Sequence, residues 1–141
     1  MVLLTKAKTI LVRLDDNTVW QSSNEGYTWQ QLLATENVKI VAFYHHAYSH
    51  DRAYLITDTN TFWYTTNTGR SWDSRPAPLP PNALGIMILR FHPDDTDYLI
   101  WTGSEGCEST FGGNCHTVAY YSRDNGHKWY EIDKRSEEHT S

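Results

Sequence analysis

Three short runs of the chain gather side chains that could do chemistry, and each run ends in a tryptophan. They read SSNEGYTW (22–29), TTNTGRSW (65–72) and SRDNGHKW (122–129). Hydroxyl groups beside Asn, Asp or Glu can take part in nucleophilic and acid–base catalysis, and Asx oxygens can bind calcium. A calcium loop of the helix–loop–helix kind needs more acids and a closing Glu, whereas Asp124 is the only acid among the three Asx positions. A calcium site is therefore not expected.

Only part of each run recurs, and the recurring part describes a turn. Aligned on the tryptophan, the runs share a hydroxyl residue, an Asn or Asp, a glycine and the tryptophan. An Asx side chain accepts hydrogen bonds from nearby backbone N–H groups, the hydroxyl bonds locally, and glycine supplies a positive φ. We interpret these residues as structural turns, each followed by a tryptophan that buries its ring against a sheet. They are Ser22, Asn24, Gly26, Trp29, Thr65, Asn67, Gly69, Trp72, Ser122, Asp124, Gly126 and Trp129.

Other acids and histidines point to no catalytic, cofactor or metal site. Paired carboxylates of a glycosidase need a defined separation across a cleft, whereas Asp94, Asp95 and Asp97 are expected to form a turn between strands. The histidines within residues 45–50 have no acid beside them except Asp51, so we interpret them as solvated loop residues. An enzyme is not expected.

Strand patterns surround the turns and must position them. Continuous apolar runs at 38–44 (VKIVAFY) and 85–91 (GIMILRF) are typical of strands buried on both faces. Each is followed by a second strand, by a third strand that leads into the turn, and by a short fourth strand that opens at the tryptophan. The first unit shows three strands, within 9–14, 18–23 and 27–32, and we expect it to lack a buried first strand of its own.

The units repeat at the spacing of propeller blades. Trp29 and Trp72 are separated by the roughly 40–50 residues that one four-stranded blade occupies. The predicted fold is all-β: about three four-stranded antiparallel blades of a larger β-propeller, over about 1–35, 36–80 and 81–134.

Matching the second strands by their letters locates the insertions. Pairing Tyr54 with Tyr98, and His45 with His92, gives the earlier unit a longer first connection. The same match places the extra residues of the last unit in GSEGCESTFGGNC (103–115). We therefore expect insertions in loops only.

Composition narrows the class of protein. Hydrophobic residues make up 39% of the chain and aromatics 13%, as in a globular protein. A net charge of −5 gives no basic face for a phosphate backbone, so nucleic-acid binding is not expected. No apolar run is long enough to span a membrane, and residues 1–15 are not a signal peptide. Residues 135–141 (RSEEHTS) resemble a translated sequencing adapter, and we expect them to be an artefact.

The turn pattern Ser-x-Asp-x-Gly-x-x-Trp is the Asp-box of sialidases, some glucanases, a photosystem assembly factor and the sortilin family. The surrounding sequence is more selective: DRAYLITDTNTFWYTTNTGRSW (51–72), RFHPDDTDYLIWTG (90–103), and Cys107 to Cys115 followed by AYYSRDNGHKW. Together these segments resemble the luminal ten-bladed propeller of the sortilin family of vacuolar sorting receptors, and its fungal members most. The resemblance covers nearly all of residues 1–134.

The resemblance implies cargo binding. Such receptors carry soluble vacuolar or lysosomal hydrolases, or peptide cargo, from the late Golgi to endosomes. It implies a single-pass anchor in the Golgi or endosomal membrane, with this segment in the lumen. Polar residues on the expected first strands, namely Lys39, His45, Arg90 and His92, are candidates for cargo contact.

A second class stays open, namely a secreted Asp-box glycoside hydrolase of the sialidase kind or a carbohydrate-binding propeller. Sialidases use a tyrosine nucleophile with a Glu and three arginines. Arg90 is the only arginine on an expected first strand, and it lacks the Phe-Arg-Ile-Pro context of sialidases.

Cys107 and Cys115 are the only cysteines, and they flank a glycine-rich loop. A disulfide closing this loop would stabilise the fold by about 2–3 kcal/mol in the loop-closure view and would place the segment in an oxidising lumen. We expect this disulfide; the rival interpretations are two reduced thiols or half of a zinc site. No second pair with zinc-finger spacing accompanies them.

Overall fold

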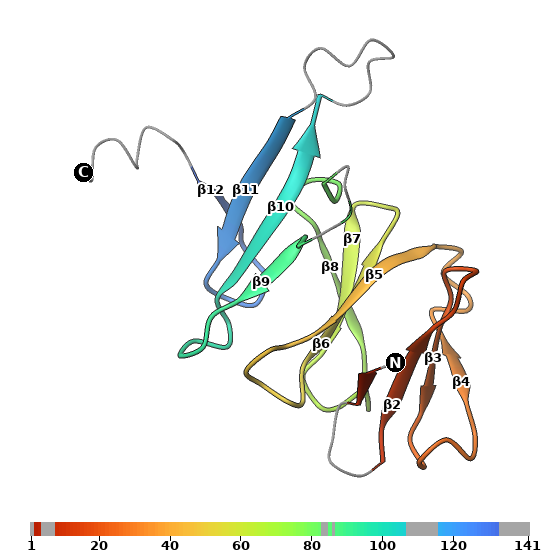
Figure 1. Ribbon diagram of the computed structural model, residues 1–141. Coiled ribbons are helices and arrows are strands. Elements are labelled where there is room, and N and C mark those ends of the chain that lie inside the picture. Colours follow the sequence, from red (N-terminus) through yellow and green to blue (C-terminus); the bar gives the residue numbers. More distant parts are fainter. Residues whose placement is uncertain (1, 4–7, 83–84, 86, 107–115, 133–141) are drawn as a thin grey trace. The chain divides into compact units, whose positions relative to one another are not determined.

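The computed structural model describes residues 2–3, 8–82, 85, 87–106 and 116–132, and in them it shows strands and turns but no helix. Twelve strands form three separate four-stranded antiparallel sheets, each in simple sequence order (Figure 1). The chain divides into two compact units, Met1–Arg75 with two sheets and Pro76–Ser141 with one. The predicted all-β class and the four-stranded units are confirmed.

The first sheet contains β1 (Val2–Leu3), β2 (Ile10–Arg13), β3 (Val19–Ser22) and β4 (Gln30–Leu32). Its first strand exists, because Val2 pairs with Leu11 and Leu3 with Ile10. The first sheet therefore has four strands, one more than the sequence predicted for this unit. A strand of two residues is too short to leave a hydrophobic pattern in the sequence.

The second sheet contains β5 (Ile40–His45), β6 (Ala53–Thr57), β7 (Thr61–Thr65) and β8 (Asp73–Pro76). All five residues of β6 are buried, whereas in β5 only Ile40 is. The expectation that the apolar first strands are buried on both faces was wrong for β5. It is the edge strand of its sheet, while β6 lies between two neighbouring strands.

The third sheet contains β9 (Leu89–Phe91), β10 (Leu99–Glu105), β11 (His116–Ser122) and β12 (Tyr130–Glu131). Its central strands β10 and β11 are the longest of the three sheets and lie side by side (Figure 1). Residues 103–105 belong to β10, so the segment predicted as a loop insertion begins inside the sheet.

The apolar run predicted as the first strand of this unit contributes only the short β9. Pro81 forms a bridge with Gly103, Ser104 N–H donates to Pro80 O at 3.2 Å, and Asn82 N–H donates to Thr102 O at 3.2 Å. Residues 80–82 therefore line the part of β10 that β9 does not reach.

Strand pairing shows that matching Tyr54 with Tyr98 was wrong. Ala53 lies opposite Thr65 and Leu99 lies opposite Ser122, and both partners are the first residue of a turn. Ala53 therefore corresponds to Leu99, whereas pairing Tyr54 with Tyr98 would have matched Ala53 with Asp97. The shared letters Tyr-Leu-Ile misled because they ignore which residue faces which across the sheet.

The same register makes His46, not His45, the counterpart of His92. The Nδ1 atoms of both histidines accept backbone N–H groups, from Tyr48 at 3.0 Å and from Asp94 at 3.1 Å. The loops that begin at these histidines then have equal lengths, so the expected longer first connection does not exist. A register shift between Ile40 and Ala42 takes up an extra residue within β5 instead.

The core of the first unit joins its two sheets. Leu11 and Val19 of the first sheet pack with Ile40, Ala53 and Leu55 of the second. Leu32, Leu33, Phe43, Trp63 and Trp72 surround this cluster. Burying one such aliphatic side chain is worth about 1.5–3 kcal/mol, so this contact fixes one sheet on the other.

Candidate functional site

Each turn between the third and fourth strands is organised by its first hydroxyl. Ser22 Oγ donates to Asn24 Oδ1 at 3.0 Å and accepts the N–H groups of Asn24 at 3.3 Å and Gly26 at 2.8 Å. Thr65 makes the same three bonds in the second sheet and Ser122 in the third. These hydroxyl residues are almost wholly buried, so the oxygen has no access to a substrate.

The Asx side chain closes the far side of the turn. Asn24 Oδ1 accepts the N–H of Thr28 at 2.9 Å, and Asn24 Nδ2 donates to Thr28 Oγ1 at 2.8 Å. Asn67 and Ser71 repeat this pair. In the third turn Asp124 Oδ1 accepts the N–H of Lys128 at 2.9 Å. A carboxylate has no N–H to donate, so Asp124 does not need an acceptor at residue 128 as the two asparagines need one at the corresponding residue. A hydroxyl therefore stands at the fourth residue on wherever the Asx is Asn.

Two successive residues of each turn have positive φ, where the sequence predicted only the glycine. Glu25 (66°), Thr68 (63°) and Asn125 (58°) precede the glycines. The N–H of each donates to a carbonyl between the first and second strands: Glu25 to Lys8 O at 3.0 Å, Thr68 to Asp51 O at 2.9 Å and Asn125 to Asp97 O at 2.8 Å. Each turn is thereby tied to the other connection at the same end of its sheet.

The turn tryptophans differ in their surroundings. Trp72 Nε1 donates to Gln21 Oε1 at 3.1 Å, and Gln21 Nε2 donates to Gly69 O at 2.8 Å, so a side chain of the first sheet holds the turn of the second. Trp29 Nε1 donates instead to the carbonyl of its own turn, Gly26 O, at 3.0 Å. Trp29 is 41% exposed, and the expectation of a buried ring was wrong for it.

The candidate cargo residues of the first unit lie apart. Lys39 is exposed just before β5, and its N–H donates to Asp58 Oδ1 at 3.1 Å. His45 is the last residue of β5, with Nε2 3.0 Å from His50 O. The two lie at opposite ends of one strand, so the structure does not bring them into one site.

In the second unit, Arg90 is exposed in the middle of β9 and its Nη2 lies 3.4 Å from Met87 Sδ. His92 is exposed beyond β9, and its Nδ1 accepts the N–H groups of Asp94 and Asp95, both at 3.1 Å. The ring of His92 lies against Tyr98, with centroids 5.7 Å apart. His92 is thus part of a turn, whereas Arg90 presents its side chain at the surface.

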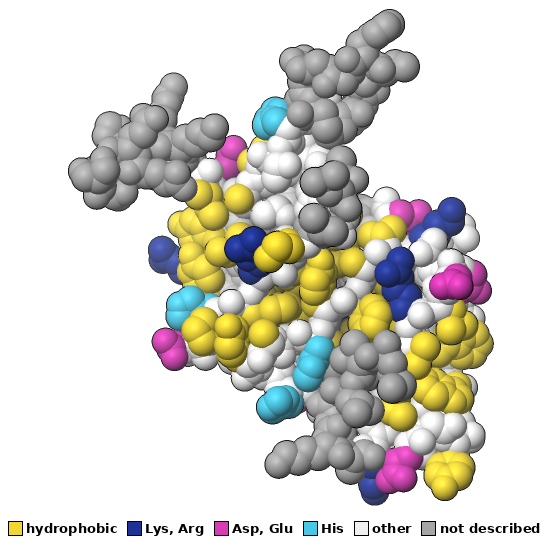
Figure 2. Space-filling model, viewed as in Figure 1, with side chains coloured by type: hydrophobic (Ala, Val, Ile, Leu, Met, Phe, Trp, Pro, Cys, Tyr) yellow, Lys and Arg dark blue, Asp and Glu magenta, His cyan; other side chains and the backbone are white. Residues whose placement is uncertain are grey.

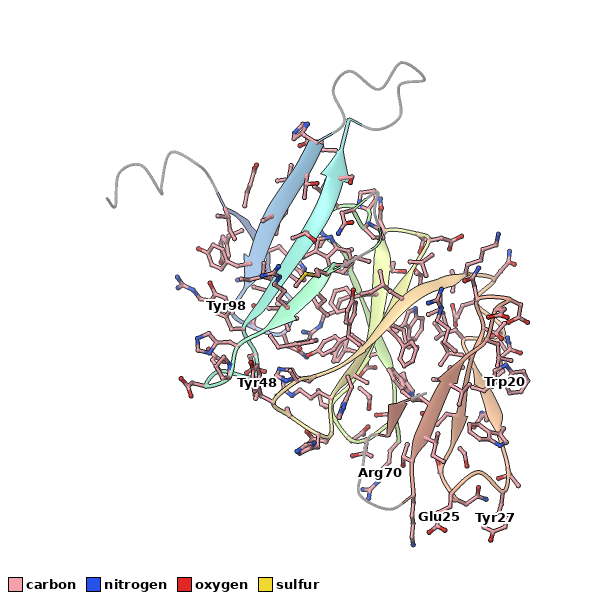
Figure 3. The ribbon with its side chains drawn as sticks, viewed as in Figure 1. Trp20, Glu25, Tyr27, Tyr48, Arg70 and Tyr98 are labelled. Atoms are coloured by element: carbon pink, nitrogen blue, oxygen red, sulfur yellow. The ribbon has the colours of Figure 1, made fainter. Side chains whose placement is uncertain are left out.

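Arg90 is the first of four residues that lie opposite one another across the strands of the third sheet, and two of the four are tyrosines. Arg90 lies opposite Ile100, Ile100 opposite Tyr121, and Tyr121 opposite Tyr130. Tyr98 stacks on Tyr121 at 5.9 Å and 8°, and the rings of Tyr121 and Tyr130 are 5.4 Å apart. This row was not predicted from the sequence, although three tyrosines in or next to the strands of one unit were a visible signal (Tyr98 is labelled in Figure 3).

Among the described residues no three His, Cys, Asp or Glu lie close enough to share a metal ion. Nor does that part of the chain hold a helix able to cross a membrane. Cys107 and Cys115 lie outside the described residues, as do residues 135–141. The disulfide stays a prediction.

Comparison with known proteins identifies the family. The model of the family described as "Sortilin, neurotensin receptor 3" matches residues 17–140. The chain belongs to the sortilin family.

Relatives within the sortilin family carry the name vacuolar protein sorting/targeting protein 10. The one from Laccaria bicolor is 60% identical over 128 residues, which is 91% of this chain and 8% of that relative. The one from Mycosarcoma maydis is 46% identical over 133 residues, which is 91% of this chain and 9% of that relative. The chain therefore spans less than a tenth of the length of these curated relatives.

Solved structures confirm the propeller fold of this sortilin-family segment. YCF48 bound to D1 peptide superposes with a TM-score of 0.56 at 14% identity, covering 92% of this chain and 37% of that one. YCF48 from Cyanidioschyzon merolae gives a TM-score of 0.51, also at 14% identity, covering 91% and 38%. At this identity the likeness concerns the fold alone. Each four-stranded sheet is therefore a propeller blade.

Proposed function

We propose that this chain is part of the luminal cargo-binding domain of a sorting receptor. Its cargo is soluble vacuolar hydrolases or peptides, carried from the late Golgi to endosomes. The observation that carries the proposal is the 60% identity to a vacuolar protein sorting/targeting protein 10 over 91% of the chain. The sortilin family consists of sorting receptors, not enzymes.

The turn geometry supports binding in preference to catalysis. The hydroxyls of Ser22, Thr65 and Ser122 are buried and form their hydrogen bonds within their own turns. Nucleophilic catalysis needs a hydroxyl that reaches the substrate and a base beside it. The polar residues that first suggest chemistry therefore serve to hold the blades together.

Arg90 is the strongest of the four candidate cargo residues. It is an exposed cation on an edge strand, and it shares its row with Ile100, Tyr121 and Tyr130. A guanidinium beside apolar and aromatic surface suits a peptide carboxylate with a hydrophobic side chain next to it. His45 and His92 are secondary candidates, because a ring nitrogen of each lies against a backbone group. Lys39 is also secondary, because it lies before β5 and outside the row of Arg90.

Capture of a vacuolar hydrolase by the full-length receptor tests this assignment. Arg90→Ala should weaken capture, and the hydrolase should be secreted instead of reaching the vacuole. Arg70→Ala is the matched control, because Arg70 is an exposed arginine of the second turn (labelled in Figure 3). Equal capture by both variants would remove Arg90 from the site. Normal hydrolase sorting in cells that lack the receptor would contradict the function itself.

The luminal location and the membrane anchor belong to the same proposal. Non-reducing peptide mapping of the receptor should find Cys107 joined to Cys115. Free thiols at both positions would argue against an oxidising lumen. Hydrolysis of a sialoside by the purified protein would favour the glycosidase instead.

A further inference from the structure

Charged side chains on the face shown in Figure 2 lie scattered among hydrophobic and uncharged polar ones, so among the described residues of that face charge alone marks no ligand site. A reactive group lies instead in the third turn. Asn125 is the only asparagine of the sequence that is followed by glycine. Glu25 and Thr68 stand before the glycines of the other two turns, and neither carries a side-chain amide.

An Asn-Gly pair can lose its side-chain amide without an enzyme. The backbone nitrogen of the glycine bonds to Cγ of the asparagine, its proton passes to a solvent base, and the side-chain nitrogen leaves as ammonia. Water then opens the imide ring at either of its carbonyl carbons, which leaves aspartate or isoaspartate. Glycine favours ring closure because it has no Cβ to obstruct the attack. Asparagine is for such reasons among the thermolabile residues.

In the folded turn the attacking nitrogen is engaged. Gly126 N–H donates to Ser122 Oγ at 2.8 Å, and this bond is buried. The same hydroxyl accepts the N–H of Asp124 at 3.3 Å and donates its own hydrogen to Asp124 Oδ1 at 2.8 Å. The hydroxyl oxygen is thereby fixed against the Gly126 N–H. Burial keeps a solvent base away from the proton that must leave.

The asparagine is held as well. Asn125 is only 7% exposed, and its N–H donates to Asp97 O at 2.8 Å. The hydrogen bonds of Asn125 N–H and Gly126 N–H fix the peptide groups on both sides of the Asn125 Cα. Ring closure requires the Gly126 nitrogen to swing toward Cγ, so its bond to Ser122 must break first.

We propose that Asn125 is a latent site of spontaneous deamidation, which the third turn keeps unreactive until the turn opens. The rate of modification then follows the population of the open turn. Aspartate at position 125 can return to the turn, because Asx residues tolerate a positive φ. Isoaspartate adds a methylene to the main chain, so the N–H groups on either side no longer reach Asp97 O and Ser122 Oγ together. The third turn thus sets a chemical lifetime for its blade.

Mass spectrometry of the full-length receptor measures the modification. Folded and urea-unfolded samples are incubated at neutral pH, and the peptides that contain Asn125, Asn24 and Asn67 are compared. Asn125 should react at least about ten times more slowly in the folded receptor, the factor that about 1.4 kcal/mol of turn stability gives. Asn24 and Asn67, which are not followed by glycine, should react slowly in both samples. Equal rates at Asn125 in the two samples, or no faster reaction there than at Asn24 when unfolded, would overturn the proposal.

Variants of the folded receptor test the part played by the turn. Ser122→Ala removes the acceptor of the Gly126 N–H and should speed the modification of Asn125 roughly tenfold. Ser122→Thr should leave the rate unchanged, because Thr65 makes the same bond in the second turn.

Val118→Ala is the matched control for general loss of stability. It removes buried methyl groups from β11 of the same blade and leaves the hydrogen bonds of the turn in place. Urea unfolding gives the stability that each variant loses. For the same loss, Ser122→Ala should speed the modification more than Val118→Ala. Equal acceleration would show that global unfolding controls the reaction, and the protective role of the turn would be wrong. Should Ser122→Ala fail to fold, the comparison of folded with unfolded natural receptor still decides whether the site is latent.

Discussion

The indole N–H of Trp72 donates to Gln21 Oε1 across the boundary between two blades, at 3.1 Å. The same glutamine donates its amide hydrogen to Gly69 O at 2.8 Å, so one side chain binds both ends of the second turn. The two partners are 51 residues apart in the sequence. A turn that looks local is therefore completed by the neighbouring blade.

Gln21→Ala should destabilise the contact between the first two blades. It removes both hydrogen bonds and leaves a part-buried indole N–H and a carbonyl to find other partners, for a loss of about 1–3 kcal/mol in the free energy of unfolding. Urea unfolding of the purified protein measures it. Gln30→Ala, at an exposed position of β4, is the control. Equal stabilities for the two variants would contradict a role for Gln21.

Ser122→Ala should destabilise the third blade, because the N–H groups of Asp124 and Gly126, the second of them buried, lose their acceptor. The expected loss is about 1–3 kcal/mol. Ser122→Thr should be nearly neutral, since Thr65 makes the same bonds in the second turn. Thermal unfolding distinguishes them; a threonine variant as unstable as the alanine variant would show that the three turns are not equivalent.

Thr68→Asn should stabilise the protein. Thr68 has a φ of 63°, a conformation that is costly for a β-branched residue and easier for asparagine, which stands at the corresponding position 125. The expected gain is up to about 1 kcal/mol. Thr66→Asn, two residues earlier and outside the positive-φ pair, controls for the change of side chain. A loss of stability at position 68 would refute the strain argument.

Asp124 should give the third turn a dependence on pH that the other two lack. Burial raises the pKa of this carboxyl, but the N–H of Lys128 and the hydroxyl of Ser122 outweigh it and lower the pKa below its ordinary value of 3.8. A depressed folded-state pKa contributes stability above pH 3.8 that is lost as the pH falls through the folded-state value.

Asp124→Asn removes that contribution. The difference in unfolding free energy between the natural protein and this variant should shrink as the solution is acidified below about pH 4. Asp73→Asn, at an exposed carboxylate of β8, controls for the general effect of charge. A difference that does not change with pH would show that the Asp124 carboxylate is not held by its turn.

Local patterns were sufficient to predict the turns and the order of the strands. Hydroxyl, Asx, glycine and tryptophan recur at fixed offsets because the bonds among them span four residues or fewer, and such bonds leave a signature in sequence. Which residue of β6 corresponds to which residue of β10 could not be predicted in that way. It depends on pairing with Thr65 and Ser122, which letter similarity around Tyr54 concealed.

Features that depend on distant partners were missed for the same reason. Gln21 is an unremarked residue of β3 until the second blade is placed beside it. The row of Arg90, Tyr121 and Tyr130 comes from three separate strands. β1 is too short to show an alternating hydrophobic pattern in the sequence. The positive φ of Glu25 is a backbone property that does not change which side chains are apolar, so it leaves no hydrophobic pattern either.

The segment beside β10 also limits how the third blade can associate with foreign chains. Pro80 O and Asn82 N point at β10, so Pro81 between them turns its backbone outward. Proline has no N–H, and the outward edge there offers an acceptor without its donor. An unpaired strand edge is a template for runaway strand addition. At Pro81 the part of β10 that β9 does not reach is closed to such growth, also before the neighbouring blades are in place.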